Sequence, residues 1–306
     1  MSEAAEERLR QRLRAGGLAH RAEAILAVAA PCVWLDSRRE EDTAIAVGAS
    51  KLGGLPDLPA GAEWPEWPEW RGNPMAFIAQ IRLDESSRFD DEGILPATGL
   101  LSIFFATDGE PKGNEDDDDP TSWRVMHVDG DPASFTRRGA PAHLPEGYRF
   151  QSSSLACSRW ITLPDVDDPE VAALGFTHEE RLAYIEVESR FHEEERNTLF
   201  GTYLLGHAYT LNGSALLEPY RVTHGLPYPG MERYPKWPRG KERERMLARL
   251  AEMRRAAVRE WRLLFQTDGG ATDMDFAGGG ILHVTIAREA LRRRDFSRAW
   301  MDLDFV

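Results

Sequence analysis

Two glutamines inside apolar segments are the first side chains whose positions suggest a site. Gln80 lies in F-I-A-Q-I-R-L and Gln266 lies in L-L-F-Q-T-D, so both amides are expected to be buried. A buried amide without hydrogen-bond partners costs about 1–3 kcal/mol, so each glutamine needs partners. The two side chains could face a shared cleft and bind a ligand. They could equally hold the backbone of a neighbouring loop, and this structural role is the hypothesis we favour.

Three aspartates close behind the second glutamine form a candidate acid–base group: Asp268, Asp273 and Asp275. With His207, or with Asp84, their carboxylates could bind a metal ion or transfer protons. The same aspartates belong to T-D-G-G and T-D-M-D, which are typical turn sequences. Turns between strands are therefore the favoured interpretation.

Tryptophans spaced by three residues mark a second candidate surface. Trp64, Trp67 and Trp70 alternate with prolines in W-P-E-W-P-E-W. Such rings can form a stacking platform for sugars or peptides. They can also fold back and cover a core, which is the role expected of Trp64.

Motifs of common enzyme classes are missing from the sequence. It contains no G-x-S-x-G, P-loop, dinucleotide-binding glycine fingerprint or His-zinc motif. Cys32 and Cys157 lack C-x-x-C spacing, so neither a disulfide framework nor a thiolate metal site is predicted. The acidic run at 115–119 could attract Ca²⁺, but it lacks the ligand spacing of an EF-hand loop. We therefore predict no metal and no cofactor.

The charge of the chain limits its partners. With 37 Lys and Arg against 51 Asp and Glu, the formal net charge is −14, which disfavours nucleic acid and acidic lipid. A basic or neutral protein or a small ligand fits better. The N-terminus lacks the apolar core of a signal peptide, and no apolar run is long enough to span a membrane. We expect a cytoplasmic location and make no prediction of oligomeric state.

Periodicity predicts both helices and strands. Apolar residues recur at helical spacing near the N-terminus, and T-H-E-E beginning at Thr177 is a capping-box sequence. Helices are predicted at 1–30, from 177 to 196, and at 240–260, the last being basic and amphipathic. Strands are predicted at 32–36, 43–48, 75–84, 99–106, 123–129 and 156–163.

Features of the first half of the chain recur in the same order in its C-terminal third. L-L-G-H at 204–207 corresponds to L-G-G-L at 52–55, and a proline and aromatic loop follows at 227–238. Gln266 then corresponds to Gln80. Finally, G-G-G-I-L-H-V-T-I corresponds to G-L-L-S-I-F-F. This order indicates an internal duplication.

The predicted fold class is α+β. It has a duplicated, largely antiparallel β core with pseudo-two-fold symmetry, flanked by N-terminal helices and the basic amphipathic helix. We expect one domain over residues 1–306. It comprises a helical segment at 1–30, two similar halves at about 40–130 and 201–306, and a connecting region at 131–200.

Several of these segments together resemble a known family. They are K-L-G-G-L-P-D-L-P with a following Trp-Pro, F-I-A-Q-I-R-L, G-L-L-S-I-F-F, and L-L-F-Q-T-D with G-G-G-I-L-H-V-T-I. Over about residues 40–306 the chain resembles the YwqG-like family, a widespread bacterial domain of unknown function. The resemblance implies a duplicated antiparallel core and no particular activity. A-T-D-M-D-F-A-G lacks the tryptophan that accompanies this segment in the family.

Two classes of function remain open. The favoured hypothesis is a non-catalytic module that binds a protein or ligand, for example an acidic immunity or inhibitor protein that masks a basic partner. Its binding candidates are Gln80, Gln266, Trp64, His207, Asp268 and Asp275. The alternative is a hydrolase that uses the carboxylates and His207 in a cleft between the two halves.

Overall fold

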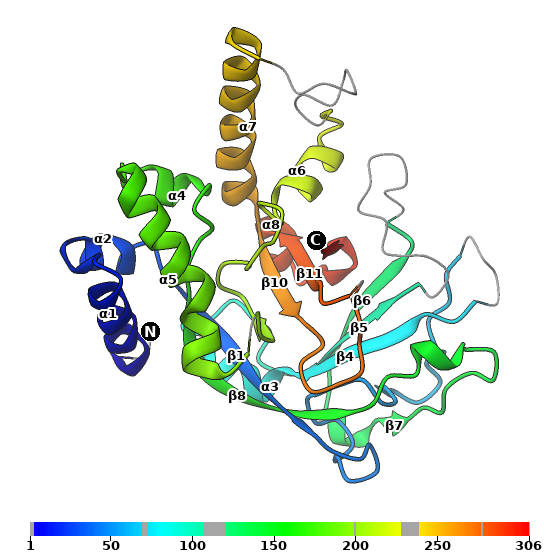
Figure 1. Cartoon of the computed structure of the whole chain (residues 1–306). Helices are drawn as coiled ribbons and strands as arrows, with labels where there is room; N and C mark the ends of the chain where they lie inside the picture. The colour runs from blue at the N-terminus through cyan, green and yellow to red at the C-terminus, as the bar shows by residue number, and fades with distance from the viewer. Residues whose placement is uncertain are drawn as a thin grey trace.

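The computed structural model of the chain describes residues 3–68, 73–106, 120–198, 200–227, 239–276 and 278–305 (Figure 1). Three features considered above lie outside these residues. They are the acidic run at 115–119, Trp70, and all but the first residue of the proline and aromatic loop at 227–238.

Ten strands in the described residues form one antiparallel sheet (Figure 1). In order across the sheet they are β12 (Trp300–Asp304), β11 (Ile281–Ala287), β10 (Trp261–Thr267), β9 (Tyr203–Leu204), β1 (Ala30–Arg39), β8 (Ser153–Thr162), β2 (Lys51–Leu52), β4 (Ala76–Arg82), β5 (Leu100–Phe105) and β6 (Trp123–Val128). A separate pair joins β3 (Asp57–Leu58) to β7 (Thr136–Arg137). Apolar runs in β4, β5, β10 and β11 are buried nearly throughout, as both-face burial requires.

The strand order is symmetric about the central β1–β8 pair. On one side β2, β4, β5 and β6 form the first half-sheet; on the other, β9, β10, β11 and β12 form the second. The strand that precedes each half-sheet in the chain pairs with the other half-sheet, because β1 contacts β9 and β8 contacts β2. The predicted α+β class with a duplicated antiparallel core is confirmed.

The region predicted to connect the halves contributes a central strand. β8 lies at 153–162, within the 131–200 segment, and pairs along its full length with β1. The boundaries of the two halves at about 40–130 and 201–306 stay a prediction.

A strand predicted at 43–48 is not formed, and residues 41–50 make turns instead. Side chains donate hydrogen bonds to backbone carbonyl groups that would pair with a neighbouring strand if this segment were in the sheet. Arg137 donates to the Ala46 carbonyl, and Gln80 donates to the Ala49 carbonyl at 2.8 Å. The apolar segment A-I-A-V-G therefore forms a turn, and polar side chains bind its backbone.

Helices cover one face of the sheet and extend from its edge. They are α1 (Glu3–Ala15), α2 (Ala22–Leu26), α3 (Leu83–Ser86), α4 (Pro169–Ala172), α5 (His178–Arg196), α6 (Leu217–Thr223), α7 (Lys241–Glu260) and α8 (Arg288–Arg292). Short 3₁₀ turns lie at Ala19–Arg21, Ser87–Phe89, Pro132–Ser134, Glu146–Tyr148 and Phe296–Arg298. No helix in the described ranges has the length and apolar character needed to cross a membrane.

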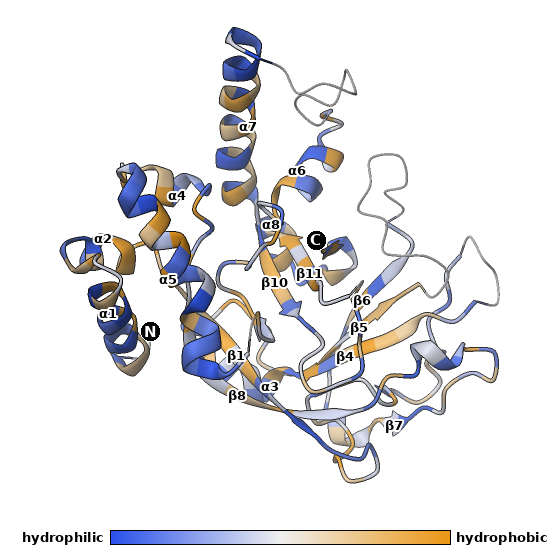
Figure 2. Ribbon diagram, viewed as in Figure 1, coloured by the Kyte–Doolittle hydropathy of each residue, from blue (hydrophilic) through white to orange (hydrophobic). Residues whose placement is uncertain are grey.

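The predicted helix signals are confirmed. α5 begins with the capping box, in which Thr177 accepts from the Glu180 amide and Glu180 accepts from the Thr177 amide. α7 buries Met246, Met253 and Ala257 on one face. Figure 2 shows the apolar colour concentrated on β4, β10 and β11, with hydrophilic turns along α1 and α7.

The sheet curls until its two edge strands meet. Trp123 on β6 donates its indole N–H to the Ala299 carbonyl at 2.9 Å. The ring of Trp123 also packs against Trp300 on β12, with 5.1 Å between centroids. One apolar core therefore draws residues from both half-sheets. The contact also covers the unpaired edges that would otherwise invite aggregation.

The same left-handed turn follows β2 and β9. Gly53 and Gly54 have φ of 59° and 70°, while Leu205 and Gly206 have 64° and 75°. In each turn a side chain accepts from the next backbone amide. Thr162, the last residue of β8, accepts from the His207 amide at 2.7 Å, and Asp42, which follows β1, accepts from the Leu55 amide at 3.4 Å. The turns are thus equivalent, as the sequence repeat predicts.

Replacing Gly206 with alanine should destabilise the fold. The new Cβ would lie 2.5 Å from Thr162 Oγ1, and the residue would keep φ of 75°. Gly61 is the matched control, since it has φ of 80° with no atom within 4 Å of an added Cβ. We expect Gly61→Ala to lose about 1 kcal/mol of unfolding free energy and Gly206→Ala at least about 2 kcal/mol more, measured in urea. Equal losses would show that the close contact is easily relieved.

Candidate functional site

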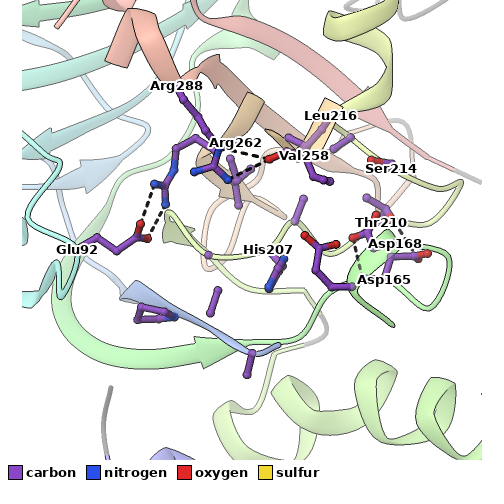
Figure 3. A pocket seen from close by; sticks show the side chains of 18 residues that line it. Glu92, Asp165, Asp168, His207, Thr210, Ser214, Leu216, Val258, Arg262 and Arg288 are labelled. Carbon is purple, nitrogen blue, oxygen red and sulfur yellow. Dashed lines mark hydrogen bonds and ion pairs between the residues drawn. The ribbon is translucent and has the colours of Figure 1, made fainter. Parts of the chain in front are cut away.

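A cavity of about 260 Å³ lies where several strands of the sheet begin or end (Figure 3). Its charged lining residues are Glu92, Asp165, Asp168, Glu170, Arg262 and Arg288. We call it the charged cavity. Figure 3 shows Arg262 and Arg288 on one side, Asp165 and Asp168 on the other, and His207 between them.

Antiparallel pairing explains why these residues meet. Five strands have one of their ends on the same side of the sheet. These are the end of β8, the start of β1, the end of β9, the start of β10 and the end of β11. The 165–170 segment follows β8, and His207 follows β9. Arg262 is the second residue of β10, and Arg288 follows β11 directly. Segments distant in sequence therefore supply one site.

Asp165, Asp168 and Glu170 form one side of the cavity, which we call the acidic wall. Backbone amides of the same segment donate to its aspartates, but two carboxylate oxygens have no partner in the described chain. Asp168 accepts the Asp165 amide at 3.2 Å through Oδ2. Asp165 accepts the Asp167 amide at 2.7 Å and the Thr210 hydroxyl at 3.3 Å. Asp168 Oδ1 and Glu170 Oε2 are buried without a hydrogen-bond partner among the described residues. The wall therefore presents two free acceptors.

Crowding of carboxylates makes this wall unusual. Burial, together with the charges of Asp165 and Glu170, raises the pKa of Asp168 to about 7. Burial and the charges of Asp165 and Asp168 likewise raise the pKa of Glu188, on α5, to about 8. Arg254 offsets only part of the effect on Asp168. The fold thus tolerates repulsion that a bound cation would relieve.

Arg262 and Arg288 form the opposite side of the cavity, which we call the basic wall. Arg262 has an ion pair with a carboxylate of the described chain, and Arg288 has none. Arg262, with 8% of its side chain exposed, binds both oxygens of Glu92 at 3.0 and 2.7 Å, while its Nε lacks a partner in the described chain. Arg288 directs Nε and Nη2 to the Val258 carbonyl at 3.3 and 3.2 Å. Burial and the nearby Arg262 lower the pKa of Arg288.

His207 is a neutral group between the walls. Burial lowers its pKa below the usual value, in spite of the Val28 carbonyl and Glu170. Its Nε2 lies 2.9 Å from the Val28 carbonyl, which can only accept, so Nε2 carries the proton. Nδ1 is therefore a potential acceptor.

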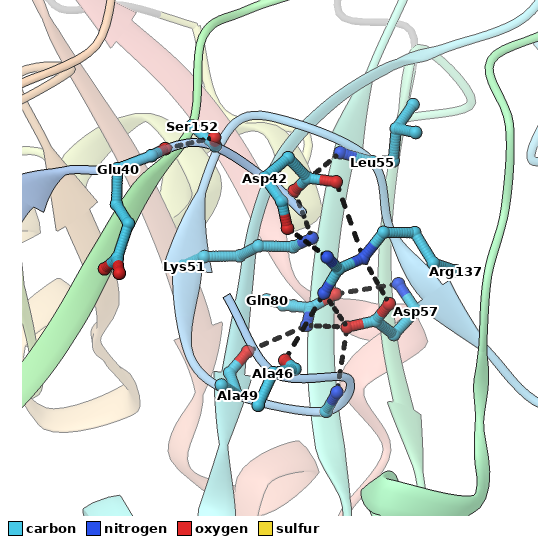
Figure 4. Close-up of polar contacts among 11 residues, drawn as sticks. Glu40, Asp42, Ala46, Ala49, Lys51, Leu55, Asp57, Gln80, Arg137 and Ser152 are labelled. Atoms are coloured by element: carbon cyan, nitrogen blue, oxygen red, sulfur yellow. Dashed lines mark hydrogen bonds and ion pairs between the residues drawn. The ribbon is translucent and has the colours of Figure 1, made fainter. Parts of the chain in front are cut away.

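Gln80 belongs to a separate, fully paired network (Figure 4). It accepts the Asp57 amide at 2.8 Å and donates to the Ala49 carbonyl and to Asp57 Oδ2 at 2.8 and 2.7 Å. Arg137 binds the same carboxylate at 3.0 Å. Burial alone would raise the pKa of Asp57, but hydrogen bonds from Arg137, Gln80 and the Gly48 amide leave it below its usual value.

Buried Lys51 extends this network. Its ammonium donates to Asp42 at 2.7 Å, and Asp42 also pairs with Arg137 at 3.4 Å. Burial lowers the pKa of Lys51, although Asp42 and Asp57 favour its charged form. Each charge here already has a partner, so the network holds the loop around β2.

Gln266 occupies the equivalent place in the second half-sheet. It accepts the Tyr209 amide at 2.9 Å and the Tyr203 hydroxyl at 3.0 Å, and donates to the Phe200 carbonyl at 3.2 Å. Tyr203 pairs with Gln266 as Lys51 pairs with Gln80. The strands β9, β1, β8 and β2 separate the two glutamine strands, and the described partners of the two amides do not overlap. Each glutamine braces its own loop.

The two candidate aspartates lie in turns. Asp268 accepts the amides of Gly201 and Gly270 at 3.0 and 2.9 Å. Asp275 accepts the Gly278 amide at 2.6 Å. Neither residue lines the charged cavity.

Trp64 lies over the outer face of the first half-sheet. Its indole donates to the Met75 carbonyl at 2.8 Å, and its ring meets Phe104 edge-on with 5.9 Å between centroids. Of the six binding candidates from the sequence, His207 alone lines the charged cavity. Gln266 is linked to it through Tyr203, whose single hydroxyl proton is shared between Gln266 Oε1 and the His207 carbonyl.

Sequence reasoning missed most of the cavity. The acidic wall comes from D-V-D-D-P-E at 165–170, immediately after a predicted strand, and this position was the one available signal. Arg262 and Arg288 sit at strand ends with no local motif. Within the described residues, no group of three or more His, Cys, Asp or Glu side chains is arranged to hold a metal ion.

Residues 50–304 match a family described as a domain of unknown function, DUF1963. The chain belongs to this family. The matched region runs from β2 to β12 and contains Glu92, the acidic wall, His207, Arg262 and Arg288. A search of curated proteins found no match. The expectation of a domain of unknown function is confirmed, and the DUF1963 match carries no activity.

Asp168→Asn should stabilise the protein at high pH. The folded state keeps the Asp168 proton up to about pH 7, whereas an unfolded aspartate releases it near 3.9. Its stabilising contribution is therefore complete below pH 4 and lost as pH rises through 7. We expect a gain of about 2–4 kcal/mol in unfolding free energy at pH 8 and none at pH 3. Asp167→Asn, at the exposed neighbour, is the control and should give no gain; a pH-independent effect of Asp168→Asn would contradict the raised pKa.

Gln80→Leu should destabilise the fold by about 3 kcal/mol, because it leaves the Asp57 amide and the Ala49 carbonyl buried and unpaired. Urea titration provides the measurement, and Gln11→Leu on the exposed face of α1 is the control. A loss below about 1 kcal/mol would argue against the loop-holding role.

Proposed function

We propose that this protein is a non-catalytic binding module that holds a small polar molecule in the charged cavity. The observation that carries the proposal is that three residues of one cavity each have a buried charged atom with no partner among the described residues: Asp168 Oδ1, Glu170 Oε2 and Arg262 Nε. Leaving such groups unpaired lowers stability. Around Gln80 the same chain pairs its buried charges fully. A bound ligand would supply the missing partners at the cavity.

The size of the cavity points to a small ligand. At about 260 Å³ it falls just below the usual range for ligand pockets, about 300–1,000 Å³. Loops and strand ends on a rigid sheet form its lining, as is common for binding sites. Its volume suits a metabolite-sized molecule better than a folded partner.

The charges favour a cationic group on the ligand. Asp165, Asp168 and Glu170 line the cavity. Of the two arginines of the basic wall, Arg262 is already neutralised by Glu92. An ammonium or guanidinium group would find charge-assisted hydrogen bonds at the acidic wall.

A hydrolase is the second candidate, because Asp168 titrates near neutral pH within the same cavity as neutral His207. Asp268 and Asp275 are occupied in turns, so proton transfer would fall to Asp168 and Glu170. A catalytic role predicts turnover that Asp168→Asn removes while ligand binding persists. The inhibitor form, with a basic protein partner, stays a prediction that rests on the net charge of −14.

Isothermal calorimetry with diaminopentane as the probe tests the cationic preference. Both amines stay protonated from pH 6 to 8, whereas Asp168, with a pKa of about 7, ionises over this interval. We expect binding up to about tenfold tighter at pH 8 than at pH 6. Asp168→Asn should remove this pH dependence, and Glu170→Gln should weaken binding at both values. If neither diaminopentane nor a five-carbon molecule with a single ammonium group binds at pH 8, the cationic preference is contradicted.

A further inference from the structure

We infer that the charged cavity selects a zwitterion, a short molecule with an amine at one end and a carboxylate at the other, and that Arg288 receives the carboxylate. The inference rests on the proposed binding function and adds the ligand class. It follows from the separation of opposite charges across the cavity (Figure 3).

Arg288 is the free cation of the basic wall. Two of its nitrogens share a single acceptor, the Val258 carbonyl, and no carboxylate of the described chain forms an ion pair with it. A half-buried guanidinium usually has an anionic partner. Its planar donors match both oxygens of a carboxylate. Glu92 and Glu170 favour its charged form, yet neither forms an ion pair with it, so Arg288 can receive the carboxylate of a ligand.

Arg262 contributes differently. Both of its terminal nitrogens bind Glu92, and it is almost fully buried. This pair is electrically neutral and rigid, so it shapes the wall next to Arg288 without competing for a ligand anion.

The acidic wall suits an ammonium group. Asp168 Oδ1 and Glu170 Oε2 are buried acceptors for which the described residues supply no donor, and an ammonium carries three donors. Asp165 adds negative charge while its own oxygens are engaged by Thr210 and the Asp167 amide. His207, neutral and placed between the walls, separates the two charged ends.

Charge at both ends provides selection against simpler molecules. A diamine of the same length would place its second ammonium beside Arg288, and a dicarboxylate would place a carboxylate against Asp165, Asp168 and Glu170. Like charges brought together in this way are strongly disfavoured. The expected order of affinity is zwitterion, then diamine, with the dicarboxylate last.

Three probes of equal length test the inference by calorimetry at pH 8: aminopentanoate with its amine at the far end, diaminopentane, and glutarate. We expect aminopentanoate to bind at least tenfold more tightly than diaminopentane, and glutarate not to bind. Arg288→Met should weaken aminopentanoate at least tenfold without weakening diaminopentane. Arg288→Lys, which keeps the charge and loses the planar fork, should give an intermediate affinity and guards against misfolding of the methionine variant.

Arg292→Met on the same helix is the matched control, because Arg292 is exposed and pairs with Glu289. It should leave all three affinities unchanged. Equal binding of aminopentanoate and diaminopentane, or a preference that survives both Arg288 substitutions, would overturn the zwitterion while leaving the cationic binding site in place. If none of the three probes binds, the proposed function itself fails together with this inference.

Discussion

Antiparallel pairing of β1 with β8 is the interaction on which the rest of the structure depends. Ten residues of each strand lie in continuous register, from Ala30 opposite Thr162 to Arg39 opposite Ser153. β1 then receives β9 and β8 receives β2, so each half-sheet is joined to the strand that precedes the other. Neither half-sheet completes its pairing without the other, and the contact of Trp123 with Trp300 brings their outer edges together.

The glutamine networks and the charged cavity show two outcomes for buried polar groups. Gln80 and Gln266 each connect a loop backbone to a strand, and both the nitrogen and the oxygen of each amide form hydrogen bonds. At the cavity, carboxylate oxygens remain unpaired and crowd one another enough to raise the pKa of Asp168 to about 7. Unrelieved repulsion at a concave, strand-end site lowers stability, and it is one support for the proposed binding function.

Much of the fold could be predicted because its signals are local. The capping box at Thr177, the apolar face of α7 and the buried runs around both glutamines depend on residues close in sequence. The strand predicted at 43–48 was wrong, because its Ala46 carbonyl accepts from Arg137 and the Ala49 carbonyl just beyond it accepts from Gln80, both from elsewhere in the chain. A pattern of apolar letters cannot reveal that competition.

The sequence by itself determined the α+β class and the repeated order of the loop, glutamine and strand features. It also identified His207 as a candidate binding residue. These follow from periodicity and spacing, which short-range physics sets. Only the tertiary structure decided that 153–162 lies at the centre of the sheet, and that the 165–170 segment faces Arg262 and Arg288. The reason is register. Antiparallel pairing brings one end of each of five strands together, so residues at those ends share a site although they are far apart in the sequence.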